Sequence, residues 1–461
     1  MAGDDVRIGD NGGMAARGRG MRGWVLAAML GVVGCVGGSL TDGQHDAVRD
    51  LRSGLATFPG AQGFGTTTPA GRRGAVLRVT SLADRGPGTL REALQTAGPR
   101  TVVFEVGGVI QSTESWVIGD PYVTVAGQTA PSPGITLSGA GVVVATHDVL
   151  LQHLRIRAGD APDGPDPGGR DSLSIVGAAD GSLDVHDVVV DHCSISWAID
   201  EGVSTWNPGV RDITIRRSLI SENLSHSLHP KGEHSKGLLV GDHTLRIAIV
   251  ENILAQNVMR NPILKGDVSA LVASNIIYNP ACYAVHIDDP EGSGPTLATI
   301  AGNLLIPGPN TSGSLALVEA LGYVKTSSAI YLLANNTGGR GLHKAIFTPA
   351  IFHDLPDYQA SPVWVMPLDT PPPSGLPTRL SADAGARPRD RDAVDTRVIA
   401  DMLTGGGSII DSPAQVGGLP APTPTTRPLT LPDDPGGDAD GDGYTNLENW
   451  LHSLAAAQEH R

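Results

Sequence analysis

The sequence predicts an all-β protein whose chain winds into a right-handed, single-stranded parallel β-helix. Short β-branched segments that end in a polar residue recur between residues 58 and 337. The recurrences are 23 to 39 residues apart, and a repeat of roughly 20–50 residues is the mark of a stacked architecture. The polar residues that close these segments form one predicted interior column, which comprises His153, His192, Arg217, Asn252, Asn275, Asn303 and Asn335.

Alternation within each segment favours strands over helices. Val188 and Val190 point one way and Asp191 the other, at the period of two that is typical of a strand, and the segments at 213–216 and 248–251 repeat the pattern. No clear helical stretch separates the segments, and tight hairpin turns are too few for propeller blades. A parallel β-helix remains, in which interior Asn amides bond from coil to coil and variable loops leave one face to build a binding cleft.

Composition excludes several classes of protein. The chain has 461 residues with 60 Gly and 34 Pro, below the Gly and Pro content of disordered chains, and 40% are hydrophobic. Disorder and collagen are therefore excluded, and one large domain with appendages is expected. A formal net charge of -15 argues against nucleic acid or an anionic membrane surface as the default partner.

The N-terminal region has the pattern of an export signal. Three arginines precede an apolar run at 24–33, which is too short to span a bilayer. The run leads into Val-Val-Gly-Cys, which resembles a bacterial lipobox and predicts a signal peptide over 1–34 with Cys35 as the lipidated mature N-terminus. An ordinary secretory signal cut nearby is the alternative. Of the other cysteines, Cys193 and Cys282 are expected to be buried thiols, although one bridge between them is arithmetically possible.

The remaining chain divides into three predicted parts. The β-helix occupies 54–348, and a Pro-rich segment at 349–432 wraps back on it with an amphipathic helix at 390–403. The tail, 433–461, contains an Asp-x-Asp-x-Asp-Gly pattern that closely fits an EF-hand-like calcium loop, with a plain acidic tail as the alternative. The expected ligands in the loop are Asp438, Asp440, Asp442, the Tyr444 carbonyl, Asn446 and Glu448, the last one residue early.

Charge is unevenly distributed along the predicted coils. Residues 160–201 contain ten acids and one base, whereas residues 214–265 contain seven bases and four acids. Adjacent coils of a parallel β-helix lie about 4.8 Å apart. The sequence therefore predicts an acidic patch beside a basic patch, although solvated loops of both signs would give the same count.

Four motifs, in this order along the chain, carry a resemblance to a known family. They are Phe-Pro-Gly-Ala-Gln-Gly-Phe-Gly at 58–65, the segment 79–93, Ala-Gly-Gln-Thr-Ala-Pro at 126–131, and Val-Asp-His-Cys-Ser-Ile-Ser-Trp at 190–197. With these motifs the chain resembles the pectate lyase superfamily of polysaccharide lyases, family 1 type, and in particular a secreted bacterial member. The resemblance covers roughly 58–337.

The resemblance implies a calcium site. The family's ligating carboxylates fall on Asp171 and Asp200, with Glu201 as a neighbour, and such hard oxygen ligands suit Ca²⁺. Many relatives have a further Asp where this chain has Ser204, so the site would be weaker or completed by substrate. Turn capping is the alternative role for Asp171 and Asp200.

The resemblance also implies which basic residues belong to the active site. Arg260, in an Arg-x-Pro segment, matches the family's catalytic arginine, and Lys236 matches its substrate-binding lysine, with Lys231 the second choice. Lys265 stands where relatives often carry another Arg. Three further residues, His226, His229 and His234, are expected to be loop histidines facing the cleft, with His229 a substrate contact; a zinc site is the alternative. His192 is expected to be structural.

These residue types suit β-elimination from a uronate chain. The proton to be removed lies α to a carboxylate, and Ca²⁺ with Lys236 would stabilise the resulting enolate-like charge. Arginine is an unusual base because its pKa exceeds about 12, so Arg260 would act either as the base or as an electrostatic stabiliser.

The expected function is that of an exported, monomeric, calcium-dependent lyase of polygalacturonate that yields 4,5-unsaturated oligogalacturonides. Its partner would be an acidic plant-type polysaccharide, with no nucleic acid, and with a membrane only through the lipid anchor. The alternatives are a non-catalytic β-helix that binds carbohydrate or mediates adhesion, a lyase for another uronate polymer, and a glycoside hydrolase on the same scaffold.

Overall fold

The structure is a computed structural model, which describes residues 54–459 except 314, 322, 338–346, 350–356 and 359–371. The predicted signal peptide and Cys35 lie outside the described residues. Among the helices that are described, none is long and apolar enough to cross a membrane.

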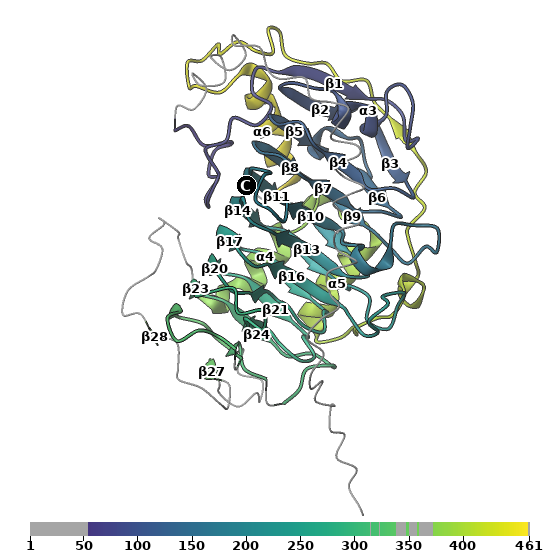
Figure 1. Cartoon of the computed structure of the whole chain (residues 1–461). Helices are drawn as coiled ribbons and strands as arrows, with labels where there is room; N and C mark the ends of the chain where they lie inside the picture. The colour runs from purple at the N-terminus through teal and green to yellow at the C-terminus, as the bar shows by residue number, and fades with distance from the viewer. Residues whose placement is uncertain are drawn as a thin grey trace, which may run out of the picture. The chain divides into compact units, whose positions relative to one another are not determined.

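Three long sheets make up the β-helix (Figure 1). Within each sheet almost every strand pairs in parallel with a strand one coil away, so most coils contribute one strand to each sheet. Sheet 1 contains β1 Ala75–Val79, β2 Arg100–Phe104, β5 Val123–Ala126, β8 Val149–Gln152, β11 Val185–Asp191, β14 Val210–Arg216, β17 Leu245–Val250, β20 Val268–Ala273, β23 Thr296–Ala301, β26 Ala329–Leu333 and β28 Asp357–Tyr358.

The other two sheets follow the same order. Sheet 2 contains β4 Trp116–Ile118, β7 Val142–Val144, β10 Leu173–Val176, β13 Glu201–Trp206, β16 Lys236–Val240, β19 Ile263–Leu264, β22 Val285–Ile287, β25 Val318–Ala320 and β27 Phe347–Pro349. Sheet 3 contains β3 Val106–Gln111, β6 Ile135–Ser138, β9 Leu154–Arg157, β12 Ser194–Ser196, β15 Leu219–Ser221, β18 Ile253–Ala255, β21 Ile276–Tyr278 and β24 Leu304–Ile306, with β29 Thr425–Thr426 antiparallel to β3. The predicted all-β architecture is confirmed, and it fits a right-handed parallel β-helix.

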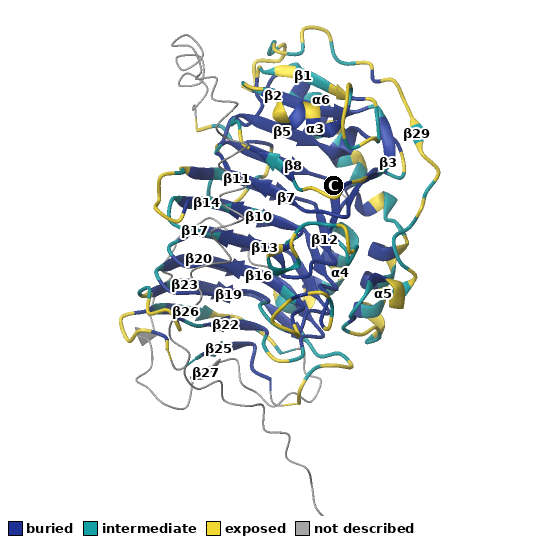
Figure 2. Cartoon of the chain, turned by 45° about the vertical axis from the view of Figure 1, so that its right-hand side comes forward, coloured by how far each residue is buried: buried dark blue, intermediate teal, exposed yellow. Residues whose placement is uncertain are grey.

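The interior is apolar because strand residues alternate between its core and its outer surface. Val188 and Val190 of β11 are fully buried in the main core with Ile213 and Ile215 of β14, one coil later. Figure 2 shows these strands as a continuous buried stack. The short helix α3, Leu90–Gln95, adds Leu90 and Leu94 to the same core at the end formed by the first strands.

The predicted asparagine ladder is present. Asn252 donates from Nδ2 to Oδ1 of Asn275 at 3.0 Å, Asn275 donates to Asn303 at 2.9 Å, and Asn303 donates to Asn335 at 3.0 Å. Each amide also bonds to a backbone carbonyl inside the coil, as Asn275 does to Ile249 at 2.8 Å. The ladder thus supplies hydrogen bonds to buried backbone carbonyl groups at the bend, which would otherwise lack partners.

The first three members of the predicted column do not belong to this ladder. Strand register aligns His153 and His192 with Arg217 and then with Glu251, the residue before Asn252. All four have positive φ, between 45° and 60°, at the corner that leaves sheet 1. The residues one step later, among them Cys193 and Ser218, precede Asn252 in the interior column. The expectation that His192 lies in the interior ladder is therefore wrong, because its corner position directs it to the outer side.

The C-terminal segment covers the outside of the β-helix. Helices α4, Leu376–Asp383, and α5, Ala393–Thr404, pack on the outer face of sheet 3 (Figures 1 and 2). The amphipathic helix predicted at 390–403 is confirmed by α5, which begins after the N-cap Asp392. Helix α6, Asn446–Gln458, packs Leu447 and Leu451 against β2 and β5.

Two outward arginines of β9 hold α5 in place. Arg157 is fully buried and its guanidinium donates to Asp392 at 2.6 and 3.0 Å and to Asp395 at 2.9 Å. Arg155 lies 3.3 Å from Asp395, which also accepts a hydrogen bond from Ser194 at 2.7 Å. The segment is therefore fixed by buried ion pairs as well as by apolar packing.

Cys193 is buried and Cys282 is exposed, and both are free thiols. The expectation of two buried thiols is wrong for Cys282, which lies in the irregular segment between β21 and β22.

Candidate active site

The predicted catalytic residues form a row at the starts of consecutive strands of sheet 2. Glu201 begins β13 and lies opposite Lys236, which begins β16. Lys236 is in turn bridged to Met259, the neighbour of Arg260, and Asp171 lies two residues before β10. Parallel register thus brings residues from four coils to one edge of sheet 2.

Close packing of two coils positions Arg260. The backbone N–H of Leu238 donates to the carbonyl oxygen of Arg260 at 2.6 Å. A Cβ at Gly237 would lie 2.6 Å from the same oxygen, so only glycine permits this approach. The Arg260 guanidinium then ion-pairs with the Glu201 carboxylate, and its side chain keeps 19% of its surface exposed.

Asp171, Asp200 and Glu201 form a compact acidic cluster. One oxygen from each lies within 4.8 Å of the others. Burial and the charges of Glu201 and Asp200 raise the pKa of Asp171 well above its usual value, and burial and Asp200 also raise the pKa of Glu201. Such crowding of buried carboxylates disfavours their charged forms unless a cation is shared. The donor set therefore fits Ca²⁺, which takes carboxylate oxygens.

Two serines complete the surroundings of Asp171. Its Oδ2 accepts hydrogen bonds from Ser174 at 2.8 Å and from Ser204, while its Oδ1 accepts from the backbone N–H of Glu201 at 2.9 Å. Ser204 therefore reaches the same carboxylate but brings no charge.

Lys236 faces the acidic cluster from the next coil. Its Nζ lies 2.6 Å from His234 Nε2 and 3.9 Å from Asp200 Oδ1. Burial, with a smaller contribution from the charge of Arg260, lowers the pKa of Lys236 to about 8. The carbonyl oxygen of Lys236 accepts from Asn223 Nδ2 at 3.0 Å, so both ends of the residue are held.

The hydrogen bonds of His234 define its tautomer. Its Nδ1 lies 3.2 Å from the carbonyl oxygen of Gly232, which can only accept, so Nδ1 carries the proton. Nε2 therefore presents a lone pair to the ammonium of Lys236. Nε2 also lies 3.3 Å from Asp200 Oδ1, so His234 borders both charged groups.

His229 has the opposite tautomer. The backbone N–H of Lys231 donates to His229 Nδ1 at 3.1 Å, which leaves the proton on Nε2, 3.7 Å from Asp200. Burial lowers the pKa of His229 to about 4, and its ring stacks on His234 at 3.3 Å between centroids. A protonated Nε2 offers no lone pair to a metal, so this arrangement favours a supporting role over the alternative of a zinc site.

Other predicted residues lie away from this row. Lys265 follows β19 at the end opposite Arg260, where it ion-pairs with Glu291 and lies 3.7 Å from Asp242. Lys231 is exposed, and His226 is exposed beside Asp411. The supporting contacts made by His234, Ser174 and Asn223 were not predicted. The His-x-Lys spacing of 234–236 is the one sequence signal for any of them, the contact of His234 with Lys236.

The C-terminal loop brings part of its predicted ligand set together. Carboxylate oxygens of Asp438, Asp440 and Asp442 lie within 4.8 Å of one another. Glu448 instead accepts from Arg72 at 2.8 Å and from Thr445 in the capping box of α6. Asn446 donates to the carbonyl oxygens of Asp433 and Asp434 at 3.2 and 2.9 Å, and the Tyr444 ring packs against Arg72.

Sequence comparison identifies the family. A probable pectate lyase C of Aspergillus flavus is 33% identical over 437 residues, which span 87% of this chain and 94% of that protein. The chain belongs to the pectate lyase superfamily. A probable pectate lyase C of Aspergillus terreus is 31% identical across 88% of this chain and 96% of its own length. Pectate lyase 5 of Ambrosia artemisiifolia is 27% identical over 214 residues.

As a member of the pectate lyase superfamily the protein is a lyase, which confirms the expected enzyme class over the non-catalytic alternative. These relatives are fungal and plant proteins, so they give no support to the expected bacterial origin. The crystal structure of jun a 1, the major allergen from cedar pollen, matches the fold with a TM-score of 0.50 at 17% identity, over 76% of this chain and 98% of that one. No family model matches the chain.

Proposed function

We propose that this lyase cleaves polygalacturonate by calcium-assisted β-elimination and leaves 4,5-unsaturated oligogalacturonides. The proposal depends on one observation: the acidic cluster of Asp171, Asp200 and Glu201 lies beside Lys236 and Arg260 in one row across four coils. The names of the fungal and plant relatives support pectate as the substrate class.

Each residue of the row has a part in the chemistry. Asp171, Asp200 and Glu201 would hold Ca²⁺, which would supply positive charge to offset that of the substrate carboxylate. Lys236 binds the same carboxylate with its ammonium, and partial burial strengthens that attraction. Arg260 lies beside Glu201 on the adjoining coil, where it either removes the proton or stabilises the developing negative charge.

One assay tests the proposal. Polygalacturonate with Ca²⁺ is expected to give the ultraviolet absorbance of an unsaturated product, and excess EDTA is expected to abolish it. Signal only with a different uronate polymer would reassign the substrate, and no signal across a panel of uronates would overturn the proposed reaction.

Replacement of Ser204 by aspartate is expected to reduce the Ca²⁺ concentration for half-maximal activity about 10-fold, because Ca²⁺ affinity follows the number of charged ligands. Ser204 already bonds to Asp171, so the new carboxylate enters the cluster. Ser182→Asp adds the same charge on an exposed turn beside Asp180 and serves as the control. An unchanged Ca²⁺ requirement in Ser204→Asp would contradict Asp171 as a ligand.

His234→Leu is expected to reduce kcat/KM about 100-fold, since a misplaced catalytic group can cost that much. The reason is loss of the acceptor that orients Lys236 Nζ. His234→Gln keeps an acceptor near the position of Nε2 and should recover most of the activity. Equal losses in the two variants, measured with the lyase assay, would show that His234 does not act through this hydrogen bond.

The outer parts of the chain complete the proposal. An export signal at 1–34, with lipidation of Cys35, would carry a bacterial protein to the cell surface, and Asp438, Asp440 and Asp442 would bind a second Ca²⁺ at the start of α6. This loop stabilises the C-terminal helix and takes no part in the reaction.

A further inference from the structure

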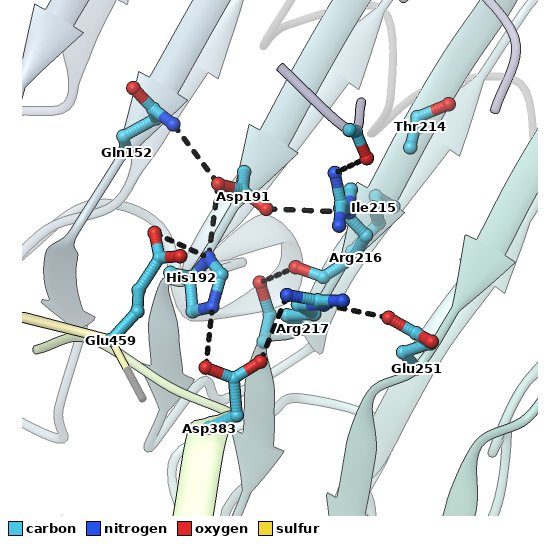
Figure 3. Close-up of polar contacts among 12 residues, drawn as sticks. Gln152, Asp191, His192, Thr214, Ile215, Arg216, Arg217, Glu251, Asp383 and Glu459 are labelled. Carbon is cyan, nitrogen blue, oxygen red and sulfur yellow. Dashed lines mark hydrogen bonds and ion pairs between the residues drawn. The ribbon is translucent and has the colours of Figure 1, made fainter. Parts of the chain in front are cut away.

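A second group of metal-ligating side chains lies at the corner between sheets 1 and 3, away from the catalytic row. His153 and His192 occupy this corner on adjacent coils, with their rings stacked at 5.2 Å. Glu459 reaches the same point from the end of α6, more than 260 residues later in the chain. Figure 3 shows Glu459 facing His192.

Burial makes the two imidazole rings costly to leave without hydrogen bonds. His153 and His192 are 0% exposed and Glu459 is 1% exposed. None of the four ring nitrogens makes a hydrogen bond of acceptable geometry, although carboxylate oxygens lie 3.0–3.5 Å from three of them. Buried polar groups without hydrogen bonds are rare, and a bound ion is one of the recognised explanations.

The spacing of the ligand atoms fits a tetrahedral cation. Glu459 Oε1 lies 3.3 Å from His153 Nε2 and 3.5 Å from His192 Nδ1. In a tetrahedral zinc site with bonds of about 2.0–2.1 Å, neighbouring ligand atoms lie about 3.3–3.4 Å apart. Atoms at this separation can share a cation between them, and the three ligand atoms of this cluster all lie within 4.8 Å of one another.

Surrounding groups resemble the outer shell of a metal site. Asp383 Oδ1 lies 3.5 Å from His192 Nε2, the nitrogen that the cation would leave free, and a carboxylate in that position fixes the ring tautomer. Asp383 is itself paired with Arg217 at 3.0 Å (Figure 3). Asp191 lies 3.0 Å from His192 Nδ1 and accepts a hydrogen bond from Gln152, so its carboxylate can supply a fourth ligand atom.

We propose that His153, His192 and Glu459 bind a divalent cation of the zinc class, which fastens the C-terminal helix α6 to the β-helix. Two imidazoles and one carboxylate form a donor set that suits zinc better than calcium, which prefers oxygen ligands alone. The cation ties two consecutive coils to the last described turn of the chain.

A proton is the competing occupant. Burial alone would lower the pKa of His192, but the charge of Asp191 overrides it and raises that pKa to about 9, whereas burial lowers the pKa of His153. A protonated His192 could attract Glu459 without a metal. The two possibilities differ in one measurable respect, since only the first requires a stoichiometric cation.

The test uses Co²⁺ as a visible substitute for zinc. The full chain is stripped with a chelator, given excess Ca²⁺ to fill sites made of oxygen ligands, and titrated with Co²⁺ at neutral pH. One equivalent is expected to bind with the intense visible absorption of tetrahedral Co²⁺, and Zn²⁺ is expected to displace it. Glu459→Gln, and separately a chain ending at Gln458, should weaken this binding at least 10-fold.

His234→Gln serves as the matched control, because it alters the other histidine-containing cluster, with Asp200 and His229, and should leave the absorption unchanged. Zn²⁺ should also raise the melting temperature of the Ca²⁺-loaded wild type and not of Glu459→Gln. Absence of tetrahedral absorption in the wild type, or equal absorption in Glu459→Gln, would overturn the proposal. So would a melting temperature that depends on pH and is indifferent to Zn²⁺, which is the behaviour of a proton in place of a metal.

Discussion

Arg260→Ala is expected to reduce kcat/KM at least about 1,000-fold, the scale on which a lost charge-stabilising donor acts in an active site. The guanidinium is the cation that lies against Glu201 in the candidate active site, and no other described arginine ion-pairs with that carboxylate. The measurement is the initial rate of ultraviolet absorbance on polygalacturonate with saturating Ca²⁺.

A matched control separates this effect from misfolding. Arg211→Ala removes a partly exposed arginine of β14 that pairs with Asp184, and it should leave the rate unchanged. Arg260→Lys keeps the positive charge but loses the planar guanidinium, whose Nη1 pairs with Glu201, so its rate should fall between the wild type and Arg260→Ala. A normal rate in Arg260→Ala with an unchanged melting temperature would remove Arg260 from the mechanism.

The fold was predictable because coil stacking repeats a local pattern. Strand alternation such as that of Val188 and Val190, and the recurrence of Asn252, Asn275 and Asn303, are visible in the sequence and correspond to the core and the ladder. The predicted interior column was displaced by one residue at His153, His192 and Arg217. Polar residues occur both at the outward corner and at the inward position that follows it, so the sequence pattern does not distinguish the two positions.

The candidate active site was predictable in part. Order along the chain and family resemblance named Asp171, Lys236 and Arg260, which register brings to one edge. The contacts of Lys236 with His234 depend on ring tautomers set by backbone groups in a loop, for which the sequence has no signal.

Contacts across long separations could not be predicted at all. Arg157 and Asp392 are 235 residues apart, and Glu459 meets His153 from the far end of the chain. The sequence predicted an amphipathic helix at 390–403. It did not predict which strands this helix, α5, would pack against. Arg155 and Arg157 are two residues apart in β9 and both point outward, yet both are buried. Buried arginines require partners, so another part of the chain must cover the outer face of this strand.

Arg157→Ala is expected to lower the free energy of unfolding by about 3–5 kcal/mol, the usual cost of removing one partner from a buried ion pair. Asp392 and Asp395 would then face the outer side of sheet 3 without the guanidinium that bonds to both. Urea unfolding followed by circular dichroism measures the change. Arg78→Ala, which removes a partly exposed partner of Glu105, should cost no more than about 1 kcal/mol.

A companion variant distinguishes lost charge pairing from lost packing. Replacing Arg155 and Arg157 by Met together with Asp392 and Asp395 by Leu removes the two guanidinium groups and the two carboxylates that pair at the contact. Apolar replacement of a buried ionic cluster is often neutral in stability. This quadruple variant should therefore be more stable than Arg157→Ala. Hydrogen bonds from Arg157 override the effect of burial and lower the pKa of Asp392 to about 2. Because this folded-state pKa lies below the unfolded value of about 4, the contribution of Asp392 is present above pH 4 and is lost as the pH falls towards 2. Equal stability of the wild type and Arg157→Ala between pH 5 and 7 would show that α5 is held by apolar packing alone.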